Sequence, residues 1–352
     1  MPNNLLIRTH NRANLGMLFQ NKQIALINKT GDNMSNKLKA LITGCFMLIV
    51  SFAQAASWPS KPIELVVAFA PGGNTDMIAR ILSEQLSQEL GQTVLVVNKP
   101  GATGLIGTKY VVDSKPDGYT YLVNVTGLVI SPHVLKSVPE DLPFQLKAVS
   151  QISSIPKAMV VNTDFPANSF DEFIEEAKNK TLSYGSSGIG SGNHLTGELV
   201  SMITGEPMTH VTYRGSSPAI LDLLGGRIDM VFDDLPVVLP FINDNKLKAI
   251  VTLSEERNPL IPEVPSVGEL GLDELVIEPW NGVLAPLNVD SKIIKAMDSA
   301  IEKVVKSQEF IDQMEERGLK AAYLNSDEYS RFIEQEYERW GSVVKNAGIQ
   351  RQ

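Results

Sequence analysis

Two glycine-rich loops carry the residue types best suited to bind a negatively charged molecule. The first spans residues 71–76 (PGGNTD) and the second spans residues 186–193 (SSGIGSGN). Each follows an expected strand and precedes an expected helix, so unpaired backbone N–H groups lie at the positive end of a helix dipole. Ser186, Ser187 and Ser191 add hydroxyl donors. The matched pair predicts an anion site, although one such loop alone is more simply a tight turn with a helix cap.

The sequence lacks the motifs of phosphate, dinucleotide and metal chemistry. It contains neither a Gly-x-Ser-x-Gly elbow nor a Gly-x-x-x-x-Gly-Lys-Ser/Thr loop. Asn193 stands where a dinucleotide fingerprint starting at Gly188 needs its third glycine. His133, His194 and His210 are not spaced i, i+4 from one another. We therefore expect no metal and no cofactor.

A serine hydrolase remains the enzymatic alternative. Ser187, His194 and Asp233 could meet from separate elements, as the members of a catalytic triad do. A histidine at a helix start more often hydrogen-bonds locally, so we expect no catalytic residue and no enzyme.

Three further charged residues have two interpretations each. Asp233 and Asp234 follow an expected strand at residues 228–232. They either cap the next helix or accept a hydrogen bond from an ammonium or hydroxyl group of a ligand. Arg214 either clamps a carboxylate or, as we expect, pairs with a surface acid.

Strand and helix patterns alternate along the chain and indicate an α/β fold. A continuous apolar run at residues 65–69 is typical of a strand covered on both faces. Apolar residues at helical spacing follow until Gly91, and Ser169 with Glu172 predicts the capped start of another helix. From residue 290 the chain is expected to be chiefly helical. The expected strands occupy residues 65–69, 94–97, 121–125, 158–161, 182–184, 211–213 and 228–232.

The final helices follow no complete sheet of their own, which predicts that they dock on the first sheet. The chain would then cross to a second lobe near Pro156 and return near residues 279–282. Two crossings between two doubly wound sheets make a hinged cleft, as in a bilobal solute binder. Trp280 and Trp340 are expected in the core or at the hinge. The first lobe is expected at residues 57–156 and 282–352, and the second at residues 157–281.

The composition excludes some classes of partner. With 352 residues, of which 43% are hydrophobic, the chain can bury the cores of two domains. Six of the 31 basic residues but only one of the 40 acidic residues precede residue 57, which leaves a net charge of −14 on the remainder. Such an acidic body lacks the footprint of a nucleic-acid binder and is repelled by anionic lipid.

The N-terminal region contains an export signal. Lys37 and Lys39 precede an apolar run at residues 40–52, and Ala53-Gln54-Ala55 presents a peptidase site. We interpret residues 34–55 as a cleavable signal peptide of a periplasmic protein, with a permanent membrane span as the alternative. Residues 1–33 fit no part of such a leader. We interpret them as an extension that precedes a true start at Met34.

Cys45, the only cysteine, lies inside this leader. The mature chain then has no disulfide, thiolate metal site or cysteine nucleophile. Residues 42–45 (ITGC) also resemble a lipoprotein cleavage box, so a lipid-anchored form is the alternative to a freely exported one.

Seven ordered motifs resemble the Bug-type extracytoplasmic receptors, which are the substrate-binding proteins of tripartite tricarboxylate transporters. The resemblance covers nearly all of residues 58–350. Its motifs lie at residues 69–80 (FAPGGNTDMIAR), 98–104 (NKPGATG), 116–119 (PDGY), 184–195 (YGSSGIGSGNHL), 213–219 (YRGSSPA), 224–229 (LGGRID) and 263–271 (EVPSVGELG).

The resemblance implies a monomeric receptor with two lobes arranged as a Venus flytrap, of the type II periplasmic kind. It implies capture of a small carboxylated solute and delivery to a permease of one large and one small membrane subunit. A ligand sensor for a signalling partner is the other non-enzymatic alternative. The implied ligand-binding residues are Ala70, Pro71, Gly72, Gly73, Asn74, Thr75, Ala102, Gly104, Thr126, Gly127, Ser186, Ser187, Gly188, Ser191 and Asp233.

Overall fold

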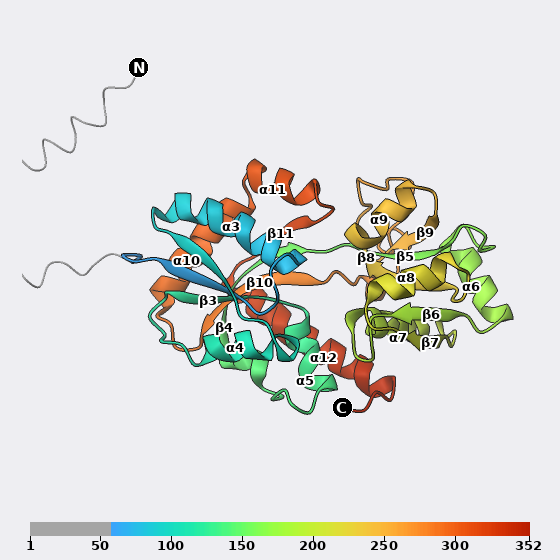
Figure 1. Ribbon diagram of the computed structural model, residues 1–352, viewed down its shortest axis with the longest axis horizontal. Coiled ribbons are helices and arrows are strands. Elements are labelled where there is room, and N and C mark those ends of the chain that lie inside the picture. The colour runs from blue at the N-terminus through green and yellow to red at the C-terminus, as the bar shows by residue number, and fades with distance from the viewer. Residues whose placement is uncertain (1–57) are drawn as a thin grey trace, which may run out of the picture. The chain divides into compact units, whose positions relative to one another are not determined.

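The computed structural model describes residues 58–352, which form two mixed β-sheets covered by helices (Figure 1). The expected extension at 1–33, the signal peptide at 34–55 and Cys45 lie outside the described residues. No helix of residues 58–352 is both long and apolar enough to cross a membrane.

The first sheet has six strands in the order β11-β4-β10-β3-β1-β2. Strand β1 pairs in parallel with β2 and β3, whereas β10 is antiparallel to β3 and β4, and β11 is antiparallel to β4. The strands are β1 (Ile63–Val67), β2 (Val94–Asn98), β3 (Thr120–Val125), β4 (Leu146–Ser154), β10 (Trp280–Pro286) and β11 (Lys320–Leu324).

The second sheet has five strands in the order β7-β6-β8-β5-β9. Strand β6 is parallel to β7 and β8, and β5 is antiparallel to β8 and β9. The strands are β5 (Lys157–Asn162), β6 (Ser183–Ser186), β7 (Thr209–Thr212), β8 (Met230–Asp234) and β9 (Leu247–Thr252).

Local signals place the helix ends. Gly91 adopts a left-handed conformation after α3, as its position at the end of the apolar pattern predicts. The Ser169 side chain accepts a hydrogen bond from the Glu172 backbone and caps α6. The helices are α3 (Asn74–Leu90), α4 (Leu105–Val112), α5 (Gly127–Val134), α6 (Phe170–Asn179), α7 (Gly192–Thr204), α8 (Ser216–Leu224), α9 (Leu235–Asn243), α10 (Ser291–Val305), α11 (Gln308–Glu315) and α12 (Ser326–Asn346), with short 3-10 turns at Ala102–Gly104, Leu142–Gln145 and Asp273–Leu275.

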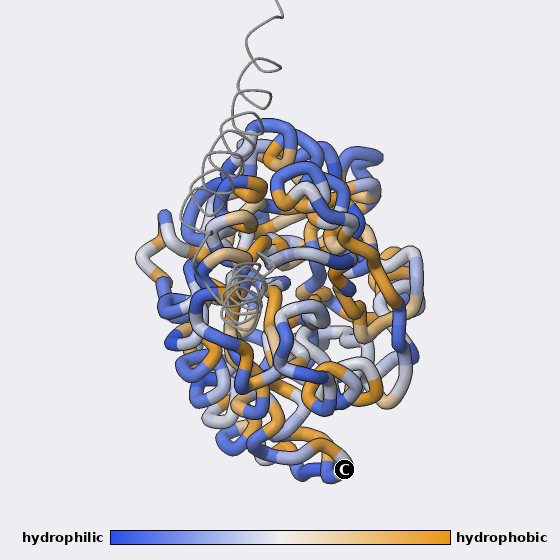
Figure 2. The backbone as a smooth tube through the Cα atoms, turned by 90° about the vertical axis from the view of Figure 1, so that its left-hand side faces the viewer, coloured by the Kyte–Doolittle hydropathy of each residue, from blue (hydrophilic) through white to orange (hydrophobic). Residues whose placement is uncertain are grey.

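Strand β1 is buried on both faces, as its continuous apolar run predicts. Leu65 and Val67 point into a core with α3 and α10, while Val66 points into a second core with α5 and α12. Figure 1 shows α3 and α10 on one side of the first sheet and α4, α5 and α12 on the other. Hydrophobic segments run through the interior in Figure 2, with hydrophilic ones around them.

The chain passes between the sheets twice. The first connection, from β4 to β5, has only Ile155 and Pro156, and the second runs from β9 to β10 over residues 253–279. The Ile155 backbone N–H donates to the Pro279 carbonyl at 2.7 Å, so the two connections lie side by side. The lobe boundaries at 57–156, 157–281 and 282–352 stay a prediction.

The C-terminal part is chiefly helical, as expected, and contains one strand that the sequence does not predict. Helices α10, α11 and α12 do pack on the first sheet and its α3 helix, as expected. However, β11 also joins that sheet at its edge. Its five residues (KAAYL) are partly exposed and lack a continuous apolar run, so periodicity alone does not mark them as a strand.

Candidate ligand-binding cleft

A cavity of about 700 Å³ lies where the two sheets, their connections and α12 meet. One wall comes from the start of α3 and from residues 125–135, and the facing wall comes from residues 187–193 at the start of α7. The connections add Ile155 and residues 276–279, the strand ends beside the first connection add Ser154 and Lys157, and α12 adds four side chains. Such a volume suits a small organic molecule.

Seven of the expected site residues line this cavity and eight do not. Those in its lining are Asn74, Thr75, Thr126, Gly127, Ser187, Gly188 and Ser191. Those outside it are Ala70, Pro71, Gly72, Gly73, Ala102, Gly104, Ser186 and Asp233. Within the second group, Gly72 donates to Asp76 in the first loop and Ser186 accepts from Gly188 in the second.

The first loop is held in place by the buried carboxylate of Asp76. Its Oδ2 atom accepts from the Gly72 backbone N–H at 2.9 Å and from Arg80 Nε at 3.0 Å. Its Oδ1 atom accepts from Arg80 Nη2 at 3.0 Å and from Asn98 Nδ2 at 2.8 Å. The hydrogen bond from Arg80 is the main reason why the pKa of Asp76 falls to about 2. Asp76 thus stabilises the start of α3.

The 102–104 turn lies behind this loop. A Cβ atom on Gly104 would lie 3.3 Å from the Phe69 ring, so the absence of a side chain lets the two segments approach closely. Between Ala102 and Gly104, Thr103 lines the cavity with a left-handed φ of 55°. The family resemblance instead implies its two neighbours, Ala102 and Gly104, as ligand-binding residues.

The second loop uses part of its backbone internally. The Gly188 N–H donates to Ser186 Oγ at 3.2 Å, and the Gly190 N–H donates to His194 Nδ1 at 3.0 Å. Ser191 caps α7 by accepting from the His194 N–H at 3.2 Å. These amides are therefore not open to a ligand, contrary to the sequence-based expectation for the loop.

Four amides at the two helix starts keep their donors free. In the described part of the chain, the N–H groups of Asn74 and Thr75 on α3, and of Gly192 and Asn193 on α7, have no hydrogen-bond partner. All four residues line the cavity. Both expected helix N-termini thus contribute free N–H groups to the cavity lining, with residues 192–193 in place of the preceding glycines. That they bind an anion stays a prediction.

The Ser187, His194 and Asp233 triad is not supported by the geometry. His194 Nδ1 is committed to Gly190, and its Nε2 lies 3.6 Å from Glu198 Oε1. The serine that contacts a histidine is Ser186, whose Oγ lies 2.6 Å from His210 Nε2. His194 therefore has the local role that its place at a helix start predicts.

His194 and His210 stack with ring centroids 3.9 Å apart behind the second loop. Burial lowers the pKa of His210 to about 4, with repulsion from His194 as a further cause, and burial also lowers the pKa of His194. Both rings stay neutral near pH 7. This state preserves the Nδ1 lone pair of His194 that accepts from Gly190.

We expect the free energy of unfolding to decrease as the pH falls from about 6.5 to 4. In this window the unfolded chain, with ordinary histidine pKa values, binds more protons than the folded chain, so acid favours unfolding. Melting temperatures between pH 7.5 and 4 test this. His210→Phe, which keeps an aromatic ring in the stack, should flatten the slope. An unchanged slope would show that His210 does not contribute to the acid sensitivity.

Lys157 and Asp234, from neighbouring strands of the second sheet, also line the cavity. Lys157 is only 2% exposed, and its Nζ lies 2.9 Å from Asp234 Oδ1 and 2.6 Å from Asn193 Oδ1. Asp234 occupies the cap position of α9 but makes no capping hydrogen bond. Asp233 is 4% exposed, burial raises its pKa, and its Oδ1 accepts from the Asp234 N–H. Sequence reasoning missed Lys157, which sits at the start of an otherwise apolar strand.

Helix α12 contributes a wall that the sequence did not predict. Arg339 Nη2 donates to the carbonyls of Glu274 and Val276, each at 2.9 Å, and so ties α12 to the second connection. Trp340 is buried, as expected of a core residue, and also lines the cavity. Arg214 is exposed and has no ion pair within residues 58–352, so neither interpretation of it is supported.

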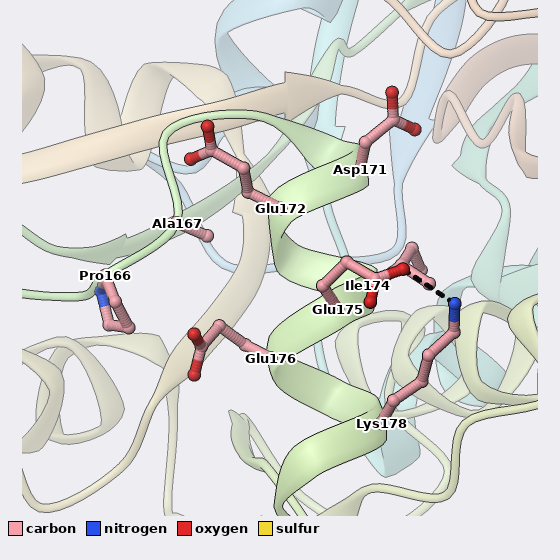
Figure 3. Close-up of a pocket in the computed structure, with 8 residues that line it drawn as sticks. All are labelled: Pro166, Ala167, Asp171, Glu172, Ile174, Glu175, Glu176 and Lys178. Carbon is pink, nitrogen blue, oxygen red and sulfur yellow. Dashed lines mark hydrogen bonds and ion pairs between the residues drawn. The ribbon is translucent and has the colours of Figure 1, made fainter.

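A separate hollow of about 510 Å³ lies on α6 (Figure 3). Its side chains come from that helix and the segment before it, and Glu175 pairs with Lys178 at 2.8 Å. The remaining charged groups are acidic and belong to a solvated helix face. This hollow lacks the facing walls of the cavity between the sheets.

Comparisons with known proteins agree with this geometry. The model of the tripartite tricarboxylate transporter family receptor matches residues 78–349. Protein BugT of Bordetella pertussis is 33% identical over 323 residues, which cover 90% of this chain and 98% of BugT.

Two solved structures share the fold over most of the chain. A TctC solute-binding protein from Polaromonas has a TM-score of 0.75 at 28% identity, with 82% of this chain and 100% of that chain covered. An R. palustris protein solved with adipate has a TM-score of 0.69 at 29% identity, with 84% and 100% covered. The resemblance to the Bug-type receptors and the two-lobed α/β fold are confirmed. The chain belongs to the tripartite tricarboxylate transporter receptor family.

Proposed function

We propose that this chain binds a small carboxylate in the cavity between its sheets and delivers it unchanged to a membrane permease. The observation that carries the proposal is the pair of helix N-termini, α3 and α7, whose free N–H groups line one cavity from two sheets. Two partial positive charges facing one space favour an anion. The R. palustris relative solved with adipate supports this ligand class.

The proposed ligand contacts are the residues that the family resemblance implies and that also line the cavity. They are Asn74, Thr75, Thr126, Gly127, Ser187, Gly188 and Ser191, to which the geometry adds Gly192 and Asn193. We further propose export by cleavage after residue 55 and delivery to a permease of one large and one small subunit.

A thermal-shift screen tests the ligand class. Carboxylates should raise the melting temperature, whereas primary amides with the same carbon skeleton should not, because the helix N-termini favour a negative charge. At 100 times its Kd a ligand adds about 2.7 kcal/mol to the free energy of unfolding. Equal stabilisation by the amides, or none by any acid, would contradict the proposal.

A further inference from the structure

Three buried polar side chains line the cavity along the first connection between the sheets. Gln151 and Ser154 belong to β4, and Lys157 begins β5. They are 6%, 4% and 2% exposed, respectively, and all three are in the cavity lining. None of them belongs to a family motif or to the expected site.

Two of these side chains have buried polar atoms without partners. Gln151 Oε1 and Ser154 Oγ make no hydrogen bond with any described residue. An unpaired buried polar atom is costly, and native proteins seldom keep one without a reason. The Gln151 amide can turn by 180° and offer either a donor or an acceptor. Ser154 can donate its hydroxyl proton.

Lys157 supplies a positive charge next to these atoms. An ammonium group has three N–H donors, and one of those on Lys157 is directed to Asn193 Oδ1. Asp234 Oδ1 lies 2.9 Å from the Lys157 Nζ as an ion pair. Arg339 is the other basic side chain in the cavity lining, and it donates to two backbone carbonyls and to Glu336. Among the lining residues, Lys157 is therefore the fully buried cation with a donor left for a ligand, whereas Arg339 is 32% exposed.

We propose that Gln151, Ser154 and Lys157 form a second anion subsite, which binds a carboxylate at the far end of the ligand. The helix N-termini bind one carboxylate through backbone amides, and this subsite binds the other through side chains. The inference rests on the proposed function and narrows it to dicarboxylates. The Asp234 carboxylate lies beside Lys157, and its side chain is 25% exposed. Because like charges repel, a ligand carboxylate is favoured here only where it contacts the Lys157 ammonium directly.

Matched series of acids test the subsite in the full mature chain. Isothermal titration compares succinate, glutarate and adipate with butanoate, pentanoate and hexanoate. At least one diacid should bind roughly 10- to 100-fold more tightly than the monoacid of equal length, as expected for a charge-assisted hydrogen bond. Lys157→Met and Ser154→Ala should each lower that ratio.

Lys248→Met is the matched control. Lys248 lies on β9 of the same sheet, bonds to Phe165 O and Asn168 Oδ1, and is not in the cavity lining. It should leave the ratio unchanged. If Lys157→Met fails to fold, Ser154→Ala carries the test.

The outcomes separate the two proposals. Monoacids that bind as tightly as diacids, or a ratio unaffected by the variants that fold, would overturn the subsite and leave the proposed function intact. If 6-aminohexanoate binds more tightly than adipate and hexanoate, Asp234 selects for an amino group at the far end of the ligand. This result would also overturn the anion subsite. Failure of every acid to bind would overturn both.

Discussion

Asp76→Ala is expected to lower both the stability of the protein and its ligand affinity. The carboxylate is 3% exposed and accepts hydrogen bonds from Gly72, Arg80 and Asn98. Removing one member of a buried ion pair costs about 3–5 kcal/mol. Because Arg80 is 54% exposed and can be hydrated, we expect about 2–3 kcal/mol here. Urea unfolding measures this loss.

The same substitution should lower affinity because the first loop loses its anchor. Without the bond to Asp76, the Gly72 N–H no longer fixes the turn that presents Asn74 and Thr75. A suitable control is Asp244→Ala, since Asp244 pairs with Lys246 where both side chains are about 60% exposed. That change should cost less than about 1 kcal/mol. Equal losses in the two variants would show that Asp76 has no special role.

Gly282→Ala is expected to destabilise the protein by about 2–3 kcal/mol through overpacking. A Cβ at this position would overlap the Oη and Cζ atoms of Tyr329 and come within 2.7 Å of its Cε1. Tyr329 is fully buried on α12 and packs against Trp280 with ring centroids 5.4 Å apart, so its ring cannot move aside. Chemical unfolding measures the loss.

Ligand affinity should also fall in Gly282→Ala. The clash with Tyr329 displaces α12, which also carries Trp340 in the cavity lining. Gly225→Ala is the control, because Gly225 follows α8 and is not in the cavity lining. Its added Cβ would meet the Leu221 carbonyl at 3.4 Å and the exposed end of the Arg227 side chain at 3.2 Å, which can move aside. The double variant with Tyr329→Leu should lose less than the sum of the two single changes. If the losses of unfolding free energy in the two single variants simply add in the double variant, the contact with Tyr329 is not the source of the strain.

Much of the architecture follows from local signals. The apolar run of β1, the glycine at the end of α3 and the serine cap of α6 each depend on neighbours in the sequence, and the structure confirms them. By contrast, β11 is a short edge strand whose identity comes from pairing with β4. The antiparallel insertion of β10 between β3 and β4 also depends on distant pairing, which periodicity does not encode.

The candidate site also contains parts that local sequence predicts and parts that depend on distant contacts. The helix starts at Asn74 and Gly192 could be predicted because glycine-rich loops and caps are local patterns. The buried state of Lys157 could not, since it depends on Asp234 at the end of a neighbouring strand. Nor could the wall from α12, whose position is fixed by packing against β4 and by the Arg339 bonds to the second connection.

The two-residue link between β4 and β5 limits how the halves of the molecule can rearrange. Proline restricts φ at Pro156, and Ile155 is bonded to Pro279, so little backbone freedom exists at this point. Any reorientation must resemble a swing about a fixed pivot rather than a slide. Ser154 and Lys157 flank the pivot and therefore travel least, while residues of the second sheet that lie farther from it travel more.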